Sequence, residues 1–223
     1  MITLLQTGVT DSTGVETTMS LFDFAAKGGW IMIVLALLSL IAVYIFVERW
    51  VAIKNASKVD VNFMNNIKDN IHDGKIKSAI NLCQRNNSPV ARMIEKGVER
   101  IGRPLSDIQA SVENVGSLEV ARLEKGMPIL ASISGGAPMI GFLGTVIGMV
   151  QAFYNMEQAS NKIDMSLLSG GIYTAMITTV GGLIVGIFAY FAYNYLVTRI
   201  NQVVYSMESK TIEFMDLLNE PIN

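Results

Sequence analysis

Four threonines place hydroxyl groups inside two long apolar segments of this chain. They are Thr145 in one segment and Thr174, Thr178 and Thr179 in the next. Thr145 lies twelve residues before Glu157, and Thr178 lies fourteen residues after Asp164. At the rise of an α-helix, both lie about 18 to 21 Å from the loop between the segments. We therefore expect hydroxyls from two antiparallel helices to meet at one depth and to form a polar belt.

A simpler interpretation of these threonines stays open. Each hydroxyl could donate to the carbonyl four residues earlier in its own helix and only aid packing. The sequence alone does not decide between the two.

The apolar segments carry no acid or base. Residues 30–47, 127–156 and 165–198 hold no Asp, Glu, Lys, Arg or His. Proton transport normally needs a titratable group at depth, so if this chain handles protons, a partner must supply the acid. The same absence speaks against an intramembrane enzyme or a metal site, so we expect neither catalytic residues nor a cofactor. His72 falls at a predicted turn, and Cys83, the single cysteine, is expected to be a small core residue.

The element that must position three of the threonines is the segment Met165–Thr198, thirty-four residues without a charge. A bilayer's hydrocarbon core takes about 20 helical residues, so this segment predicts a spanning helix. Small residues share one face: Gly171, Thr174, Thr178, Gly182 and Val185. Bulky residues share roughly the opposite face: Ile172, Met176, Val180, Leu183, Ile187 and Phe191. In lipid, the bulky face should meet acyl chains and the small face should meet protein.

Residues 127–156 predict another span with the same division. Its small face carries Gly141, Gly144, Thr145, Gly148 and Ala152, and its bulky face carries Ile140, Leu143, Ile147, Val150 and Tyr154. Six glycines of the two spans are predicted to let the backbones approach closely: Gly141, Gly144, Gly148, Gly171, Gly182 and Gly186. Pro128 and Pro138 are expected to kink the helix.

Charge and hydropathy give the remaining organisation. Apolar residues make up 51% of the chain and charged residues 16%, which excludes an ordinary soluble domain. Trp30 to Val47 predicts a first span that Glu48 and Arg49 end. Thirteen of the seventeen Lys and Arg residues lie between Arg49 and Lys125, which predicts that this region is cytoplasmic and that the N-terminus lies outside. The expected parts are a periplasmic tail and interfacial segment (1–29), a first span (30–48), a cytoplasmic helical region (49–126), a second span (127–156), a periplasmic loop (157–164), a third span (165–198) and a cytoplasmic C-terminal helix (199–223).

The cytoplasmic region should be helical. Turns are predicted at residues 72–74, at 86–89 and at 102–104, and from Leu105 a helical pattern runs into the second span. Its charges alternate in sign, which is typical of solvated helix faces and not of a nucleic-acid surface. A heptad-like seam is expected on the C-terminal helix, packed against the helix before the second span: Ile200, Val204, Met207, Thr211, Phe214 and Leu218. The predicted fold is therefore an all-α membrane protein with three transmembrane helices, the last two extending into a cytoplasmic bundle.

Several of these stretches resemble the MotA/TolQ/ExbB proton-channel family, and its ExbB members most. The stretches are LFDFAAKGGWIM (21–32), the ER pair at Glu48 and Arg49, RLEKGMPILASISGGAPMIGFLGTVIGMVQAF (122–153) and GGIYTAMITTVGGLIVGI (170–187). The resemblance covers nearly the whole chain from Leu21. Thr145 and Thr179 match the family's pore-lining threonines, which implies that they line an ion pathway together with Thr174 and Thr178. Thr174 stands where many members carry a glutamate.

The resemblance implies an inner-membrane homo-pentamer whose second and third spans surround a pore. A single-span, ExbD-like partner would supply a membrane aspartate, and a TonB-like protein would transmit the work to outer-membrane transporters. H⁺ is the implied ion, and Na⁺ is the alternative because Thr174 leaves a hydroxyl-rich ring. A TolQ-type role in envelope maintenance and a passive membrane scaffold are the other hypotheses. The family's flagellar members have four spans against three here.

Overall fold

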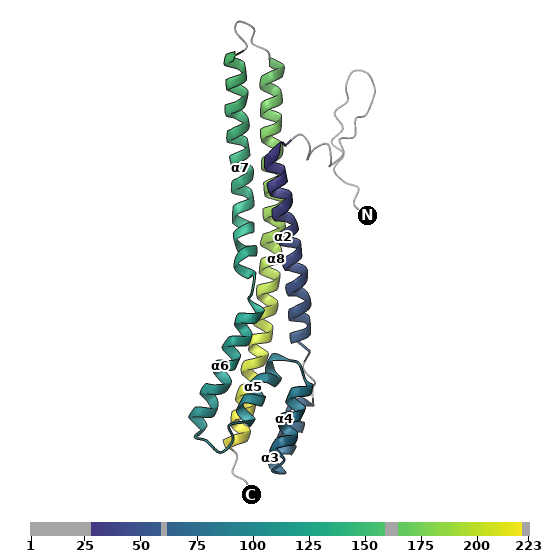
Figure 1. Ribbon diagram of the computed structural model, residues 1–223, viewed down its shortest axis with the longest axis vertical. Helices are drawn as coiled ribbons and strands as arrows, with labels where there is room; N and C mark the ends of the chain where they lie inside the picture. Colours follow the sequence, from purple (N-terminus) through teal and green to yellow (C-terminus); the bar gives the residue numbers. More distant parts are fainter. Residues whose placement is uncertain (1–27, 59–61, 159–164, 220–223) are drawn as a thin grey trace, which may run out of the picture. The chain divides into compact units, whose positions relative to one another are not determined.

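The computed structural model of the chain describes residues 28–58, 62–158 and 165–219, and every regular element in these ranges is an α-helix. The predicted all-α fold is thus confirmed for the described residues. In chain order the helices are α2 (Trp30–Ala56), α3 (Phe63–His72), α4 (Ile76–Arg85), α5 (Pro89–Val98), α6 (Leu105–Leu123), α7 (Met127–Gln158) and α8 (Met165–Asn219), as Figure 1 shows. The predicted tail up to residue 27 and the loop at 159–164 lie outside the described residues.

Three helical stretches are long and apolar enough to cross a membrane, as the sequence predicted. They are α2, the stretch that ends with α7, and the part of α8 from Leu168 onward. The chain divides into two compact units, and α2, α7 and α8 each contribute to both. We call residues 28–41, 132–158 and 165–189 the spanning unit, and residues 42–58, 62–131 and 190–219 the bundle unit.

The first of these helices continues past the charged pair that was expected to end the first span. α2 runs on through Glu48 and Arg49 to Ala56. Arg49 is only 8% exposed. Its guanidinium pairs with the Glu48 carboxylate and also donates to the Arg122 carbonyl at 3.0 Å. The Arg49 charge is thus satisfied inside the protein, whereas the Glu48 side chain is 45% exposed. Glu and Arg are both good helix formers, so the helix continues through them.

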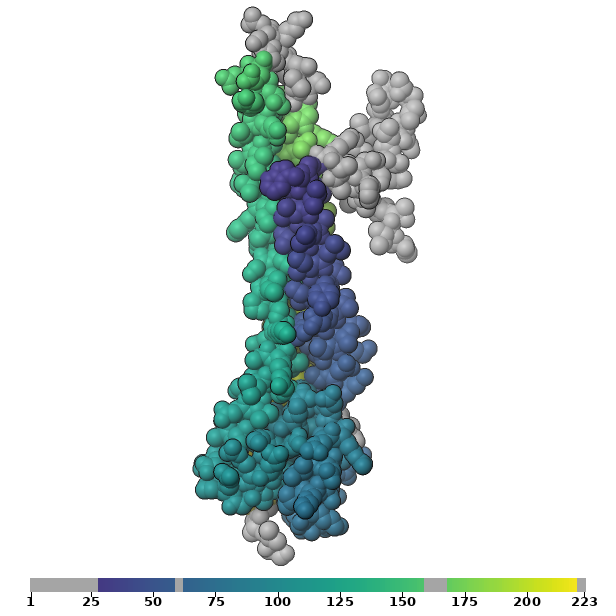
Figure 2. Space-filling view, in the orientation of Figure 1, coloured from purple at the N-terminus to yellow at the C-terminus, as the bar shows by residue number. Residues whose placement is uncertain are grey.

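The helices α3 to α6 follow the turn signals of the sequence. Gly74 and Gly102 adopt φ values of +71° and +97° at two of the predicted turns, a conformation that glycine adopts readily. At the third turn the Ser88 hydroxyl accepts from the Ala91 amide at 3.2 Å and caps α5, with Pro89 as its first residue. In Figure 2, the atoms of these helices, coloured blue to teal, form one continuous surface.

The helical run expected from Leu105 into the second span is interrupted. α6 ends at Leu123 and α7 begins at Met127. Gly126 has a φ of +82°, and Pro128 occupies the first turn of the new helix. A glycine in the left-handed region ends a helix, and a proline in the first turn starts one, because its missing N–H has no partner to lose there.

By contrast, α8 is one helix of 55 residues that covers both the predicted third span and the predicted C-terminal helix. Its seam differs from the prediction by one residue at two places: Val203 and Leu217 are buried, and Val204 and Leu218 are half-buried. The seam packs on α5 and α6. A methyl group added at Gly97 would overlap the Phe214 ring, and one added at Gly116 would lie 4.0 Å from the Met207 methyl. The predicted packing on the helix before the second span is therefore present.

The division of α8 into a small and a bulky face also agrees with the sequence. On the small face Thr178 and Gly182 are buried. On the bulky face the exposed residues are Met176, Val180, Leu183, Ile187 and Phe191, and Ile172 is half-buried.

Candidate functional site: the contact between two spanning helices

Glycines bring the backbones of α7 and α8 into direct contact in the spanning unit. A methyl group added at Gly182 would lie 2.6 Å from the Ala137 carbonyl oxygen and 2.8 Å from the Gly141 Cα. One added at Gly141 would lie 2.8 Å from the Thr178 carbonyl oxygen. No side chain fits at either place, so the two helices can approach this closely only because both residues are glycine.

All six glycines named from the sequence lie along this contact. Gly144 faces the Thr178 side chain, Gly148 faces Ala175, Gly171 faces Ala152, and Gly186 faces the Pro138 ring. Sequence reasoning missed Ala137 and Ala175, which are fully or almost fully buried opposite the glycines. Their spacing of four residues from Gly141 and Gly171 was the available signal.

Pro138, within α7, also lies at the contact between α7 and α8. Pro138 has no N–H to donate to the Ser134 carbonyl four residues earlier, yet α7 continues through it. On α8, a methyl group at Gly186 would lie 3.1 Å from that carbonyl oxygen. Gly186 thus leaves room for both the ring and the carbonyl.

Two threonine hydroxyls of α8 converge on one carbonyl of α7. The Thr179 hydroxyl donates to the Gly141 carbonyl at 3.2 Å. The Thr178 hydroxyl lies 3.3 Å from the same oxygen and 2.7 Å from the Ala175 carbonyl in its own helix. A hydroxyl has one proton to donate, so the shorter bond to Ala175 is the stronger one. Thr178 is 1% exposed and Thr179 is half-buried.

The other two threonines do not join this cluster. The Thr145 hydroxyl donates to the Phe142 carbonyl in its own helix at 2.6 Å, and its side chain is half-buried. Thr174 is half-buried, and its hydroxyl makes no hydrogen bond within the described residues. The structure therefore joins Thr178 and Thr179 to Gly141, and leaves Thr145 and Thr174 apart. The pore-lining role of all four stays a prediction.

The charges of the bundle unit are not all solvated, which corrects the interpretation of that region as alternating exposed faces. The Glu119 carboxylate is 3% exposed and accepts from Arg92 of α5 and Arg122 of α6, each at 2.5 Å. Arg122 in turn offers its carbonyl to Arg49 of α2. A buried carboxylate needs such partners, so Glu119 ties α6 to α5. The sequence shows these charges, but the burial of one of them depends on the packing of α5 and α6.

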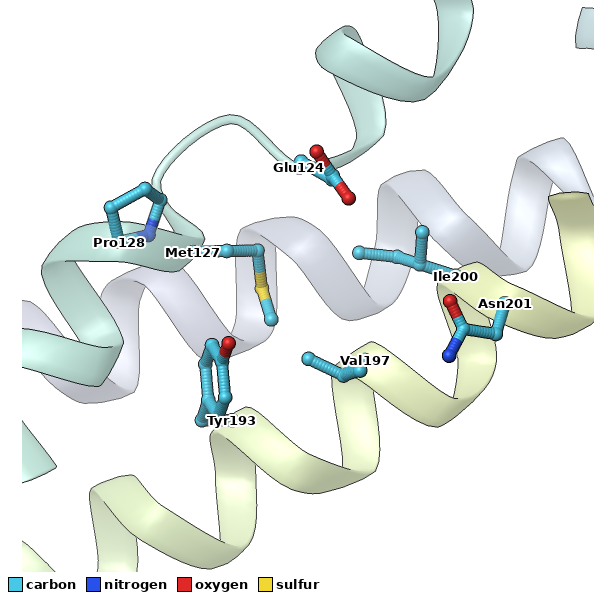
Figure 3. A pocket seen from close by; sticks show the side chains of 7 residues that line it. All are labelled: Glu124, Met127, Pro128, Tyr193, Val197, Ile200 and Asn201. Carbon is cyan, nitrogen blue, oxygen red and sulfur yellow. The ribbon is translucent and has the colours of Figure 1, made fainter.

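A cavity of about 320 Å³ also lies in the bundle unit, at the turn between α6 and α7. Figure 3 shows Glu124 on this turn and Met127 and Pro128 at the start of α7, facing four side chains of α8. Those four are Tyr193, Val197, Ile200 and Asn201. No pattern in the sequence indicates this cavity, because the cavity depends on the interruption between α6 and α7 at Gly126.

The arrangement defines a class of protein: a helical membrane protein whose apolar segments meet through glycines and hydroxyls and carry no Asp, Glu, Lys, Arg or His. Residues 85–209 match the MotA/TolQ/ExbB proton channel family, which is more than half of the chain. The chain belongs to this family.

Named relatives agree with this assignment. The chain is 25% identical to a biopolymer transport protein ExbB homologue of Methanothermobacter thermautotrophicus over 190 residues, 85% of this chain and 67% of the relative. It is 24% identical to the biopolymer transport protein ExbB of Neisseria meningitidis over 74% of this chain and 80% of the relative. It is 34% identical to the Tol-Pal system protein TolQ of Haemophilus influenzae over 101 residues, which is 45% of this chain and 44% of the relative.

Proposed function

We propose that the chain is the pore-forming subunit of an inner-membrane motor driven by proton flow. The observation that carries the proposal is the α7–α8 contact, where Thr179 bonds across to Gly141 in spans that contain no acid or base. Such a contact gives a rigid wall with oxygen atoms at depth. It offers no group that could itself carry a proton.

The missing proton carrier would come from a second polypeptide. A single-span, ExbD-like protein with an aspartate in its span fits this need. Five copies of the present chain would surround it, with α7 and α8 of each copy facing the central space. Thr145, Thr174 and Thr179 keep partial exposure in the single chain, whereas Thr178 would act by packing.

The work would come from the membrane potential. Each charge that crosses releases about 2.3 kcal/mol per 100 mV. Transient protonation of the partner's aspartate would let it pass the uncharged wall, because a neutral carboxyl is far less costly there than a carboxylate. The resulting movement of the partner, passed on by a TonB-like protein, would energise outer-membrane transport.

The proposed orientation follows from charge. The cationic residues concentrated between Arg49 and Lys125 support a cytoplasmic bundle unit, with the N-terminus and the loop at 157–164 in the periplasm. The protein would thus be a multi-pass protein of the inner membrane.

Two alternatives concern the ion and the system served. The Thr174 hydroxyl, which has no hydrogen-bond partner within the described residues, favours Na⁺ as the alternative ion, because hard cations take oxygen ligands. The similarity to a TolQ protein supports envelope maintenance as the alternative system.

The test is ion flux through the chain co-purified with its single-span partner and reconstituted in liposomes. Replacing both Thr145 and Thr179 by valine should greatly reduce flux while the complex still assembles. Thr198→Val is the matched control, because this exposed hydroxyl bonds only to the Asn194 carbonyl of its own helix. A wild-type complex that conducts neither H⁺ nor Na⁺ would refute the motor. Full flux in the double variant would support packing as the only role of these threonines.

A further inference from the structure

A second cavity of the bundle unit lies between the end of α2 and the middle of α8. Its volume is about 290 Å³. From α2 it is lined by Trp50, Ile53 and Lys54, with Ser57 directly after the helix, and from α8 by Tyr195, Leu196 and Arg199. We call it the α2–α8 groove. It shares no residue with the cavity of Figure 3.

The groove carries two cations and no acid. The Lys54 ammonium lies 5.1 Å from the centre of the Trp50 ring, and the Arg199 guanidinium carbon lies 5.3 Å from the centre of the Tyr195 ring. Both cationic side chains are exposed, and neither forms an ion pair with a carboxylate in the described part of the chain. The net charge of the groove therefore favours an anionic ligand.

The positions of these cations along their helices give the depth of the groove. Arg199 is the first charged residue after the uncharged stretch of α8. Lys54 is the first exposed cation after the apolar part of α2, since Arg49 is buried. Trp and Tyr rings favour the boundary between hydrocarbon and water. The groove thus lies where lipid headgroups lie.

We propose that the α2–α8 groove binds the headgroup of an anionic phospholipid. The phosphate oxygens accept hydrogen bonds from the Lys54 ammonium and the Arg199 guanidinium. The Ser57 hydroxyl already donates to the Ile53 carbonyl at 2.9 Å, so it adds no donor. Trp50, which is exposed, contacts the first carbons of the acyl chains. The site requires neither the pore nor the partner, so it goes beyond the proposed function.

Tryptophan fluorescence tests the proposal, because the chain has only two tryptophans. In the full chain with Trp30→Phe, Trp50 is the only tryptophan. The protein is reconstituted in bilayers that contain phosphatidylglycerol or phosphatidylcholine with brominated acyl chains, which quench a nearby indole. We expect stronger quenching by phosphatidylglycerol than by phosphatidylcholine. Replacing Lys54 and Arg199 by glutamine should lower this preference about fivefold for each cation removed.

Two further variants make the result decisive. Lys54→Arg with Arg199→Lys keeps both charges and should keep the preference. Lys77→Gln with Arg103→Gln removes the same charge at exposed positions outside the groove and should also keep it. Equal quenching by the two lipids in the wild type, or an unchanged preference in the double glutamine variant, would overturn the proposal. Absence of quenching by either lipid would mean that protein covers the groove, and displacement of the lipid by inorganic phosphate would indicate a simple anion site; both results would also overturn it.

Discussion

The two units of this chain are held together in opposite ways. In the spanning unit the closest contacts are between glycines and backbone, as at Gly141 and Gly182, and large side chains such as Phe142 and Met139 are exposed. In the bundle unit the centre is filled by large side chains such as Phe63 and Phe214, both 2% exposed or less. The difference follows from the solvent. Lipid is as apolar as leucine, so helices in lipid are stabilised by close backbone packing. In water, the burial of apolar area stabilises the fold.

The two units should respond to mutations in opposite ways. Making a side chain smaller should harm the bundle unit, and making one larger should harm the spanning unit. α8 contributes to both units, so both kinds of change can be made on one helix.

The largest expected effect is the loss of a large side chain from the bundle unit. Phe214 is completely buried against Gly97 of α5. Phe214→Ala should lower the free energy of unfolding by about 3 to 5 kcal/mol, because it removes apolar contacts and leaves a cavity. Chemical denaturation in detergent, followed by circular dichroism, measures this loss. Tyr205→Ala on the same helix is the control, since Tyr205 is 68% exposed. Equal losses in the two variants would contradict a closed core around Phe214.

The next effect is the gain of a methyl group in the spanning unit. Gly182→Ala should destabilise the protein by about 1 to 3 kcal/mol, because the new methyl group would lie 2.6 Å from the Ala137 carbonyl oxygen and would push α7 and α8 apart. The midpoint of thermal unfolding in detergent measures the change. Gly136→Ala makes the same change on α7 at a place with no atom within 4 Å of the added methyl group. A stable Gly182→Ala variant would show that backbone contact does not hold these helices together.

A smaller loss of stability is expected when the buried carboxylate of Glu119 is replaced. Among the described residues of the bundle unit, it is the carboxylate that is buried. Glu119→Gln removes the negative charge that faces Arg92 and Arg122 but keeps the size of the side chain. Both arginines are partly exposed, so solvent reduces the loss to about 1 to 2 kcal/mol. Denaturation in urea measures it. Glu113→Gln on α6 changes an exposed carboxylate that only accepts from Gln109, and it should be neutral. If Glu119→Gln left the free energy of unfolding unchanged, the Glu119 carboxylate would contribute no more to stability than a solvated charge.

Local patterns in the sequence account for part of this structure, and contacts between distant segments account for the rest. The spans and the turns at Gly74 and Gly102 follow from local patterns, namely apolar length and glycine or proline signals. The seam of α8 is displaced to Val203 and Leu217 because the choice between neighbouring positions depends on α5 and α6, which lie far away in the chain. The role of the Gly141 carbonyl could not be predicted, because composition says nothing about which backbone oxygen faces a hydroxyl. The burial of Glu119 has the same origin, since an acid in a charged helix is exposed unless another helix covers it.

The prediction with the smallest effect on stability at neutral pH concerns the thiol of Cys83, and it tests the bundle unit without changing its packing. The side chain is 1% exposed, and burial raises the pKa of the Cys83 thiol from 9.0 to about 12, with a further contribution from the negative charge of Glu95. Only the thiolate reacts with iodoacetamide, so alkylation of the folded protein at pH 8 should be about a thousandfold slower than in urea.

The same shift predicts how stability depends on pH. Because the pKa is higher in the folded state, folding favours the protonated thiol. This contribution is complete below pH 9, and it is lost as the pH rises from 9 towards about 12. Cys83→Ser has no thiol that titrates in this window, so it should lose less stability than the wild type as the pH is raised, as measured by urea denaturation at each pH. If the native thiol were alkylated as fast as the unfolded one at pH 8, the core around α4 would be open to water, and the contrast between a closed bundle unit and a glycine-lined spanning unit would fail on the bundle side.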